Sequence, residues 1–289
     1  MKVLVYGAGV TGTLFASRLH EAGNDVSLLA RGERLAALQE NGVLLAEGDG
    51  PVIRQVPVPV VERPAGSYDL IAVLVRTHQV EDVLKSIAGV RGDVLFLLNW
   101  AAGPEPLEAA IGRERVLLGF PNLGGTMDGQ VVRYRATSLL TRLVSMPIGE
   151  PDGRVTPRLR ELVQTFRSAG INAKAETRMD AWLKTHAAFE LPLGQSVHAA
   201  GGLDSLADDP AAIRDMIRRM RQNLKAMPSR PVPRAFNVLH TVPEAILVRV
   251  FRRFLRTDAA SPLATDSPAV SAELDRLAEQ VSAFEVHPS

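Results

Sequence analysis

The chain has 289 residues, of which 46% are hydrophobic and 22% charged, a composition typical of a globular protein with one large or two smaller domains. Basic and acidic residues nearly balance at a formal net charge of +1, so no overall field draws the chain to nucleic acid or to a membrane surface, and we expect neither as a partner. The absence of cysteine excludes disulfides, thiolate metal sites and cysteine nucleophiles.

The N-terminal run MKVLVYGAGVTGTLFA places apolar residues after a lysine, as a signal peptide would, but glycines interrupt it. No hydrophobic stretch of the chain approaches the length of about twenty residues that a membrane span needs. We therefore predict a buried strand at Lys2–Tyr6 and expect a cytoplasmic protein.

Strand and helix patterns then alternate along the first part of the chain. The alternation predicts a parallel sheet wound by right-handed crossovers. Strands are predicted at DVSLLAR (25–31), DLIAVLVR (69–76) and DVLFLLN (93–99), and helices at 11–22, 32–42 and 79–89.

Further strands are predicted within 115–129 and 144–151, and the run INAKAE (171–176) predicts a last strand at the edge of the sheet. The segment 156–170 predicts a helix with Pro157 in its first turn and Gly170 just past its end. From Thr177 onward only helical patterns follow. The chain is therefore predicted to form an α/β domain over 1–176 and a smaller all-α domain over 177–289.

The run VYGAGVTG after the first strand contains a G-x-G-x-x-G pattern at Gly7, Gly9 and Gly12. In this context the pattern predicts a Rossmann-type dinucleotide site, with the backbone N–H groups of Val10 and Thr11 facing the pyrophosphate at a helix start. A glycine-rich turn without a ligand is the alternative.

The end of the second predicted strand indicates which dinucleotide is preferred. An NAD site usually has an acidic residue there for the ribose 2′-hydroxyl, whereas this chain has Arg31, which suits a 2′-phosphate, and Arg34 could assist it. NADP(H) is the predicted cofactor, and an arginine that merely ends a strand in solvent is the alternative.

Together with these features, several motifs make the chain resemble the ketopantoate reductase family of NADPH-dependent 2-oxoacid reductases over nearly all of residues 1–190. The resemblance implies a Rossmann domain joined to a helical domain, with a small-molecule carbonyl substrate, and it implies that Arg76 and Asn99 bind the cofactor and that Asn99 also contacts substrate. The motifs are LVRTHQ after the third strand, LLN ending at Asn99, IGEPDG at 148–153, and the W-x-K of Trp182 and Lys184.

Lys184 is the candidate catalytic residue that the resemblance implies. An ammonium group that hydrogen-bonds a ketone oxygen stabilises the charge that hydride addition creates and can deliver the proton. The residues alone also allow a simpler interpretation, a lysine on a solvated helix face.

The chain departs from the family pattern after the third and fourth strands. Arg76 stands where the family usually has lysine, and it keeps the positive charge. Trp100 follows Asn99 in place of glycine, and it either narrows the nicotinamide pocket or is a buried aromatic residue without a role.

A second set of departures lies beyond Lys184. The asparagines that the family places four and eight residues after its lysine are replaced by Ala188 and Pro192, and Pro192 is predicted to break or kink the helix. Glu190 is a candidate replacement contact for substrate, although it lies off the face of Lys184. His186 and Glu190 lack a third ligand, so no metal site is predicted.

The C-terminal part of the chain also lacks the family's serine and its Thr-Glu-x-Asp stretch. The favoured hypothesis is an NADPH-dependent oxidoreductase that reduces a less polar 2-oxoacid or ketone than ketopantoate. A true 2-dehydropantoate 2-reductase and a catalytically idle NADP-binding regulatory protein are the alternatives. A homodimer is possible through the segment 246–256, where Ile246, Leu247, Val250, Phe251 and Phe254 are predicted on one side.

Overall fold

The computed structural model describes residues 1–134, 144–257, 259–260, 263 and 267–286. The chain divides into two compact units, each taken by itself here: Met1–Leu98 with Pro104–Met179, and Asn99–Gly103 with Asp180–Ser289. The chain therefore crosses between the units three times, and the short segment Asn99–Gly103 belongs to the second unit although both its neighbours in sequence belong to the first. The predicted domain division after residue 176 stays a prediction.

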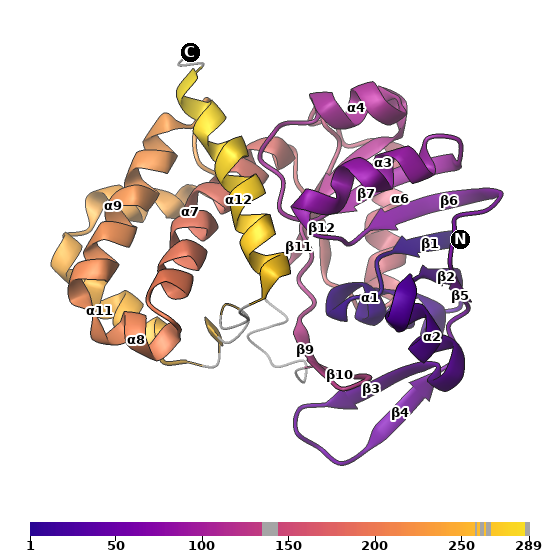
Figure 1. The fold of residues 1–289 in the computed structure, drawn as a ribbon. Coiled ribbons are helices and arrows are strands. Elements are labelled where there is room, and N and C mark those ends of the chain that lie inside the picture. The colour runs from indigo at the N-terminus through magenta and orange to yellow at the C-terminus, as the bar shows by residue number, and fades with distance from the viewer. Residues whose placement is uncertain (135–143, 258, 261–262, 264–266, 287–289) are drawn as a thin grey trace. The chain divides into compact units, whose positions relative to one another are not determined.

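An eight-stranded sheet forms the centre of the first unit (Figure 1). Its strands follow the order β12-β11-β8-β7-β6-β1-β2-β5, and all neighbours are parallel except β8 and β11. The predicted parallel sheet is confirmed, with INAKAE supplying its edge. The strands are β1 (Lys2–Tyr6), β2 (Asp25–Leu29), β5 (Val60–Val61), β6 (Ser67–Val73), β7 (Arg91–Leu97), β8 (Val116–Gly119), β11 (Met146–Gly149) and β12 (Ala173–Ala175).

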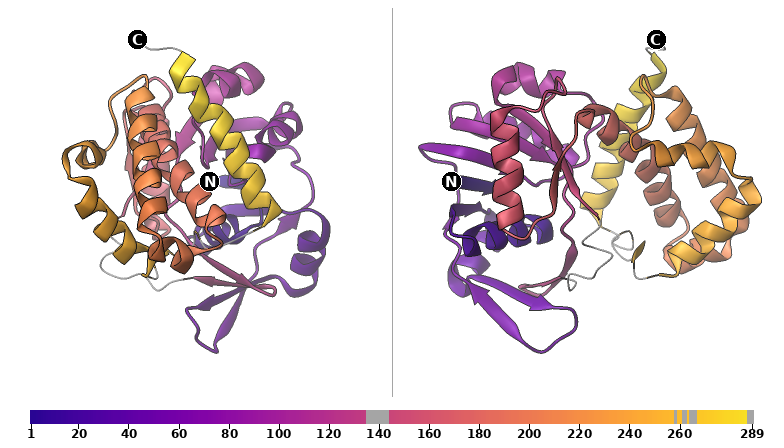
Figure 2. Two further views of the ribbon diagram at one scale, coloured as in Figure 1. Left: turned by 60° about the vertical axis from the view of Figure 1, so that its left-hand side comes forward. Right: turned by 180° about the vertical axis from the view of Figure 1, so that it is seen from behind.

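Helices cover both faces of this sheet (Figures 1 and 2). Phe15 of α1 and Phe166 of α6 meet edge to face with ring centroids 5.2 Å apart, so these two helices share one face. Burial of such rings and of the sheet's apolar side chains supplies most of the stability of this unit. The helices are α1 (Val10–Glu21), α2 (Gly32–Asn41), α3 (Val80–Ile87), α4 (Glu105–Ile111) and α6 (Pro157–Ser168), with 3₁₀ turns η1 (Thr77–Gln79) and η2 (Arg113–Arg115).

The first unit also contains a second sheet that the sequence patterns did not predict. It has the strand order β4-β3-β10-β9, with a parallel pair of β3 and β10 between two antiparallel neighbours. Its strands are short, and the central pair joins segments that are far apart in sequence, so alternation along the chain gave no sign of it. The strands are β3 (Val43–Glu47), β4 (Ile53–Val56), β9 (Gly125–Asp128) and β10 (Val131–Tyr134).

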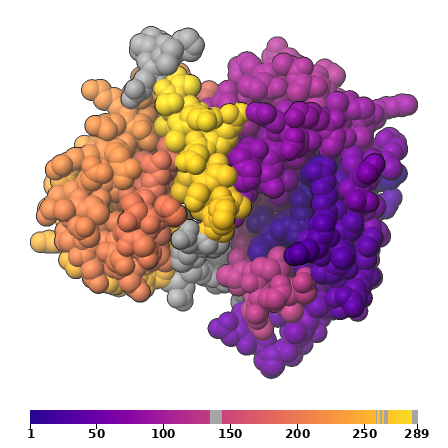
Figure 3. All heavy atoms as spheres, in the orientation of Figure 1, coloured from indigo at the N-terminus to yellow at the C-terminus, as the bar shows by residue number. Residues whose placement is uncertain are grey.

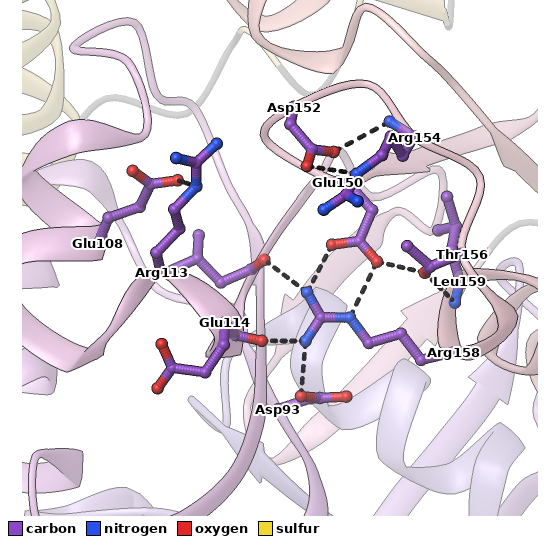
Figure 4. A network of polar contacts seen from close by, with 11 residues as sticks. Asp93, Glu108, Arg113, Glu114, Glu150, Asp152, Arg154, Thr156, Arg158 and Leu159 are labelled. Carbon is purple, nitrogen blue, oxygen red and sulfur yellow. Dashed lines mark hydrogen bonds and ion pairs between the residues drawn. The ribbon is translucent and has the colours of Figure 1, made fainter.

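A buried ion-pair network centres on Arg158 at the start of α6 (Figure 4). Its guanidinium donates to Asp93 of β7 (2.8 Å) and to Glu150 (2.9 Å), which is only 4% exposed. Hydrogen bonding to Glu150 raises the pKa of Arg158, and burial raises the pKa of Asp93 in spite of the arginine. The carboxylate of Glu150 belongs to the IGEPDG motif, so the motif ties β11 to α6 and β7.

The same motif holds the segment that leads into the long helix carrying Lys184. The backbone N–H of Glu176 donates to the carbonyl of Ile148 (2.8 Å). A Cβ on Gly149 would lie 2.2 Å from the carbonyl oxygen of Glu176, so only glycine allows the two backbones to approach this closely.

Beyond Asp180, the regular elements in the described residues of the second unit are helices and 3₁₀ turns, which confirms the predicted α/β plus all-α architecture. The buried side chains of its helices form one continuous apolar core, which also includes Ala101. The helices are α7 (Met179–Ala199), α8 (Leu203–Asp208), α9 (Pro210–Ala226), α10 (Val238–Thr241), α11 (Glu244–Leu255) and α12 (Pro268–Ser282), with 3₁₀ turns η3 (Arg234–Asn237) and η5 (Ala283–Val286). None of the helices in the described ranges is both long and apolar enough to cross a membrane.

Helix α7 runs without interruption from Met179 to Ala199, so the predicted break at Pro192 does not occur, and a kink there stays a prediction. A proline cannot donate to the carbonyl four residues earlier, which here is that of Ala188. The side-chain amide of Asn223, on α9, donates to this carbonyl instead (3.3 Å). A tertiary hydrogen bond therefore replaces the helical one that proline removes.

The apolar residues predicted on one side of α11 are divided between buried and exposed positions. Leu247 and Phe251 are buried, but Ile246 and Val250 are 48% and 57% exposed. The buried stripe instead includes Val248 and Leu255, since the helix presents a slightly rotated face to its own unit. The possible homodimer stays a prediction.

Candidate cofactor and catalytic sites

The glycine-rich turn between β1 and α1 has a conformation that requires glycine at two of its three positions. Gly7 has φ +115°, and a Cβ there would lie 2.3 Å from the carbonyl oxygen of Leu74. A Cβ on Gly12 would lie 1.9 Å from the carbonyl oxygen of Gly7, so only glycine permits this close packing of helix on strand. A Cβ on Gly9 would meet nothing within 4 Å.

The open side of Gly9 gives a ligand direct access to the backbone. Helix α1 begins at Val10, so the N–H groups of Val10 and Thr11 have no helical acceptor and lie at the positive end of the helix dipole. The turn therefore fits a pyrophosphate by the absence of side chains, by its donors and by its electrostatics.

Arg31 lies at the start of α2, where its exposed side chain turns back toward β1. Its guanidinium donates to the hydroxyl of Tyr6 and lies 5.4 Å from the centre of that ring. The same hydroxyl accepts a hydrogen bond from Ser86 of α3 (2.9 Å). The contact positions a cation beside the glycine-rich turn.

Arg34 is more closely tied to the turn than Arg31. Its Nε donates to the carbonyl of Ala8 (3.2 Å), and its Nη1 donates to the side chain of Gln130 (3.0 Å), between β9 and β10. Burial lowers the pKa of Arg34. The second sheet thus supplies a contact to the candidate cofactor site that the sequence patterns did not reveal.

Arg76 begins the 3₁₀ turn η1 after β6, and its backbone N–H donates to the side chain of Gln79 (3.0 Å). The strands β6, β1 and β2 are neighbours and parallel. Arg76, the glycine-rich turn and Arg31 therefore all follow the carboxyl ends of adjacent strands, the edge at which open α/β sheets bind ligands.

Lys184, in the second unit, is largely buried and paired. Its Nζ lies 2.7 Å from the Oδ2 of Asp180, one turn earlier on α7, and its side chain is 15% exposed. The solvated-face interpretation does not fit this burial. Asp180 was not singled out from the sequence, although its i, i+4 spacing from Lys184 is a recognisable signal.

Glu190 and Asn99 come together in the second unit. Burial favours a raised pKa for Glu190, but an ion pair with His186 and a hydrogen bond with Asn99 outweigh it, so the pKa lies below its ordinary value. Trp182 stacks on His186 with ring centroids 5.2 Å apart. This cluster occupies a different side of α7 from Lys184, which agrees with the helical spacing.

The segment after Asn99 is held by two further hydrogen bonds. The indole N–H of Trp100 donates to the carbonyl of Gly103 (2.6 Å). The backbone N–H of Ala101 donates to the Oε1 of Gln280, on α12 (2.8 Å). Trp100 is 6% exposed and closes a turn, and no sequence signal pointed to Gln280, because its partner lies 179 residues away.

The described residues contain no cluster of three or more His, Asp or Glu side chains arranged to bind a metal ion. The first unit offers a phosphate cradle with nearby arginines, and the second offers a buried lysine and a separate Asn99–Glu190–His186 cluster.

A parallel sheet with a glycine-rich turn at its carboxyl edge, followed by a helical unit, defines a Rossmann-type protein. Residues 3–146 match the family model described as ketopantoate reductase PanE/ApbA, so this part of the chain carries the domain of the ketopantoate reductase family. A 2-dehydropantoate 2-reductase of Mesorhizobium japonicum is 26% identical over 212 residues, which are 64% of this chain and 63% of that protein. The chain aligns with less than two thirds of the length of such relatives.

Solved structures extend the likeness in fold to nearly the whole chain. The 2-dehydropantoate 2-reductase of Geobacter metallireducens aligns with a TM-score of 0.74 and 18% identity, covering 99% of this chain and 93% of its own. A D-mandelate dehydrogenase in complex with NADH and anilino(oxo)acetate aligns with a TM-score of 0.70 and 16% identity, covering 98% and 99%. Both confirm a Rossmann-type domain followed by a helical one.

Proposed function

We propose that the protein is an NADPH-dependent oxidoreductase that reduces the carbonyl group of a small 2-oxoacid. The observation that carries the proposal is the glycine-rich turn, whose open Gly9 and helix start fit a dinucleotide pyrophosphate. The family domain and the dehydrogenases of the same fold support a nicotinamide cofactor.

The preference for NADPH over NADH rests on the cations around the turn. Arg31 and Arg34 replace the acidic residue that would bind a ribose 2′-hydroxyl, and a guanidinium pairs well with a 2′-phosphate. Arg76 adds a third positive charge at the same sheet edge. Gly7, Gly9, Val10, Thr11 and Gly12 would hold the pyrophosphate.

Lys184 is the proposed proton donor. The bound nicotinamide supplies the hydride in this class of reaction. The ammonium of Lys184 then stabilises the developing negative charge on the substrate oxygen and transfers its proton to it, while Asp180 holds the ammonium in place. Asn99 is the proposed contact to the rest of the substrate, and Glu190, on a different side of α7 from Lys184, would act by holding Asn99.

The substrate is proposed to be less polar than ketopantoate. From Lys184 to Gly194, α7 carries no amide side chain that could hydrogen-bond the hydroxyl groups of ketopantoate. A 2-oxoacid with an apolar side chain suits such surroundings better than one with a hydroxyl group. Ketopantoate itself belongs in the substrate screen as the test of the nearest alternative.

Calorimetric titration of the protein with NADPH and with NADH tests the cofactor. We expect tighter binding of NADPH, and we expect Arg31→Ala to weaken NADPH by about tenfold or more while leaving NADH little changed, because only NADPH carries the 2′-phosphate. If neither nucleotide binds at submillimolar concentration, the proposal fails.

A screen of 2-oxoacids with NADPH then tests the activity. We expect Lys184→Ala to lose at least about a hundredfold in kcat while NADPH binding persists, as is typical when a general acid is removed. An idle NADP-binding protein would bind NADPH but reduce no 2-oxoacid, and it would show no change in Lys184→Ala.

A further inference from the structure

The C-terminal helix α12 carries the amide side chain of Gln280 at a buried position where an apolar side chain is expected. Leu277, Gln280 and Val281 are its buried residues, at the spacing of a core-facing stripe, and Gln280 is only 7% exposed. Figure 3 shows α12 in yellow, with part of its length on the surface of the molecule. An amide in a buried stripe is destabilising unless its polar atoms are satisfied.

Only one half of the Gln280 amide is satisfied by the protein. Its Oε1 accepts from the backbone N–H of Ala101 (2.8 Å), which also fixes which end of the amide is oxygen. Its Nε2 is buried and donates to none of the described residues. A buried donor of this kind is typically satisfied by a bound ligand or by an ordered water molecule.

The surroundings of this donor belong to the candidate substrate site. Ala101 lies two residues after Asn99, and Asn99 hydrogen-bonds to Glu190 of α7. The segment Asn99–Gly103 is therefore held from α7 on one side and from α12 on the other, within one unit. Helix α7 has no amide side chain between Lys184 and Gly194. The amide side chain of Gln280, on α12, contacts the segment that follows Asn99.

We propose that Gln280 is a substrate-binding residue whose Nε2 donates a hydrogen bond to an oxygen of the 2-oxoacid. This inference rests on the proposed function, since it assigns a residue to the same site. Gln280 makes one contact with each amide atom: Oε1 holds the segment after Asn99, and Nε2 binds the substrate. The residue thus links the position of that segment to substrate recognition.

Two variants of Gln280 distinguish substrate binding by Nε2 from a structural role in which Oε1 only holds the segment of Ala101. Gln280→Glu keeps an oxygen that can accept from Ala101 but, when ionised, cannot donate and repels a carboxylate. Gln280→Met keeps the volume and loses both contacts. Glu279→Gln, on the exposed side of the same helix, is the matched control.

The probe is oxamate, an unreactive mimic of a 2-oxoacid, titrated at pH 8 into the full-length protein loaded with NADPH. We expect both Gln280 variants to bind oxamate with an affinity lower by about tenfold or more, as the loss of one hydrogen bond to a charged group predicts. NADPH affinity should stay within about twofold in all three variants, and KM for a reduced 2-oxoacid should rise more than kcat falls.

If Gln280 only braces the Ala101 segment, Gln280→Glu will bind oxamate like the wild type while Gln280→Met will not, and the inference is overturned. Absence of oxamate binding to the wild type also overturns it. Reduction of a 2-oxoacid with unchanged KM in Gln280→Glu would sink this inference but leave the proposed function intact, whereas absence of NADPH binding would remove both. If Gln280→Glu does not fold, Gln280→Met can still overturn the inference, because unchanged oxamate affinity and unchanged KM in that variant would mean that Nε2 does not bind substrate.

Discussion

The three glycines of the glycine-rich turn between β1 and α1 have different physical roles although they share one motif. Gly7 and Gly12 are required by the protein itself, because a side chain at either would collide with backbone carbonyls. Gly9 meets no steric limit from the protein, so a side chain there would obstruct only a ligand bound at the turn. The two kinds of glycine therefore differ in what they do to stability and to binding.

We expect Gly12→Ala to lower the free energy of unfolding by about 2 kcal/mol or more, because a Cβ 1.9 Å from a carbonyl oxygen forces the helix away from the strand. Gly9→Ala should leave stability nearly unchanged and weaken NADPH by about tenfold or more. Urea denaturation and calorimetric titration of the two variants measure both effects. Equal loss of stability in the two variants would contradict this distinction.

Glu190 predicts a pH effect on stability. Its pKa in the folded protein lies below the ordinary value, so ionised Glu190 contributes stability above its unfolded pKa, and this contribution disappears as the pH falls through the folded pKa. We expect the wild type to be more stable than Glu190→Gln at neutral pH, with the difference shrinking below about pH 4. Denaturation curves across this range measure it, and a difference that does not change with pH would argue against the ionised pair.

Residues that act through local spacing were predictable, and those that act across the chain were not. The glycines and Arg31 were predicted from their positions after adjacent strands, Lys184 was implied by the family resemblance, and the roles of all of them stay predictions. Gln280 could not be identified from sequence because its role depends on Ala101, which only folding brings near. Glu190 was predicted as a weak candidate, and its partner His186 explains how its charge is held.

Helix α7 shows how a tertiary contact can override a local propensity. Pro192 was predicted to break or kink the helix, and the break does not occur, because Asn223 on α9 occupies the carbonyl that proline leaves without a donor. The strand pattern of the main sheet was predictable from its continuous apolar runs. The second sheet was not, because β3 pairs with β10 from a distant part of the sequence.

We expect Asn223→Ala to destabilise the protein by about 1–2 kcal/mol, the typical effect of leaving a buried carbonyl without a donor. The same substitution should have a smaller effect in a Pro192→Ala background, because alanine restores the helical N–H donor. A double-mutant cycle by chemical denaturation measures the coupling. Additive effects would show that Asn223 does not compensate for Pro192.

The ion-pair network at the start of α6 predicts a larger loss of stability than the one expected for Asn223→Ala. Arg158→Met leaves Glu150 buried without its cation, and we expect a loss of about 3 kcal/mol in the free energy of unfolding. The control is Arg154→Met, because Arg154 is 78% exposed in its pair with Asp152 and should contribute little. Similar small effects in both variants would mean that Glu150 finds another partner.

At the scale of the whole molecule, the second unit is not continuous in sequence. Ala101 contributes to its apolar core and donates to Gln280 of its last helix. The α/β and all-α halves were predictable from the change of pattern near Thr177, but this exchange of a short segment was not, since residues 99–103 have no helical pattern.

We expect a fragment of residues 180–289 to be less stable than the same unit within the full chain, because it lacks the segment Asn99–Gly103. Thermal unfolding followed by circular dichroism should show a lower Tm and a broader transition for the fragment. Ala101→Gly in the full chain gives a milder comparison, since it keeps the N–H donor and removes one methyl group. A fragment that melts like the intact unit would contradict the importance of this segment.

The chain passes between the two units three times, and this determines how a chimera with a relative has to be built. A chimera that exchanges the helical half at a single junction near Met179 would join a foreign α12 to the original Asn-Trp-Ala-Ala-Gly sequence, and the Gln280 partner of Ala101 would be lost. Transplanting substrate specificity therefore requires three junctions, at 98/99, 103/104 and 179/180. In an engineering sense, those five residues belong to the helical half and should be exchanged with it.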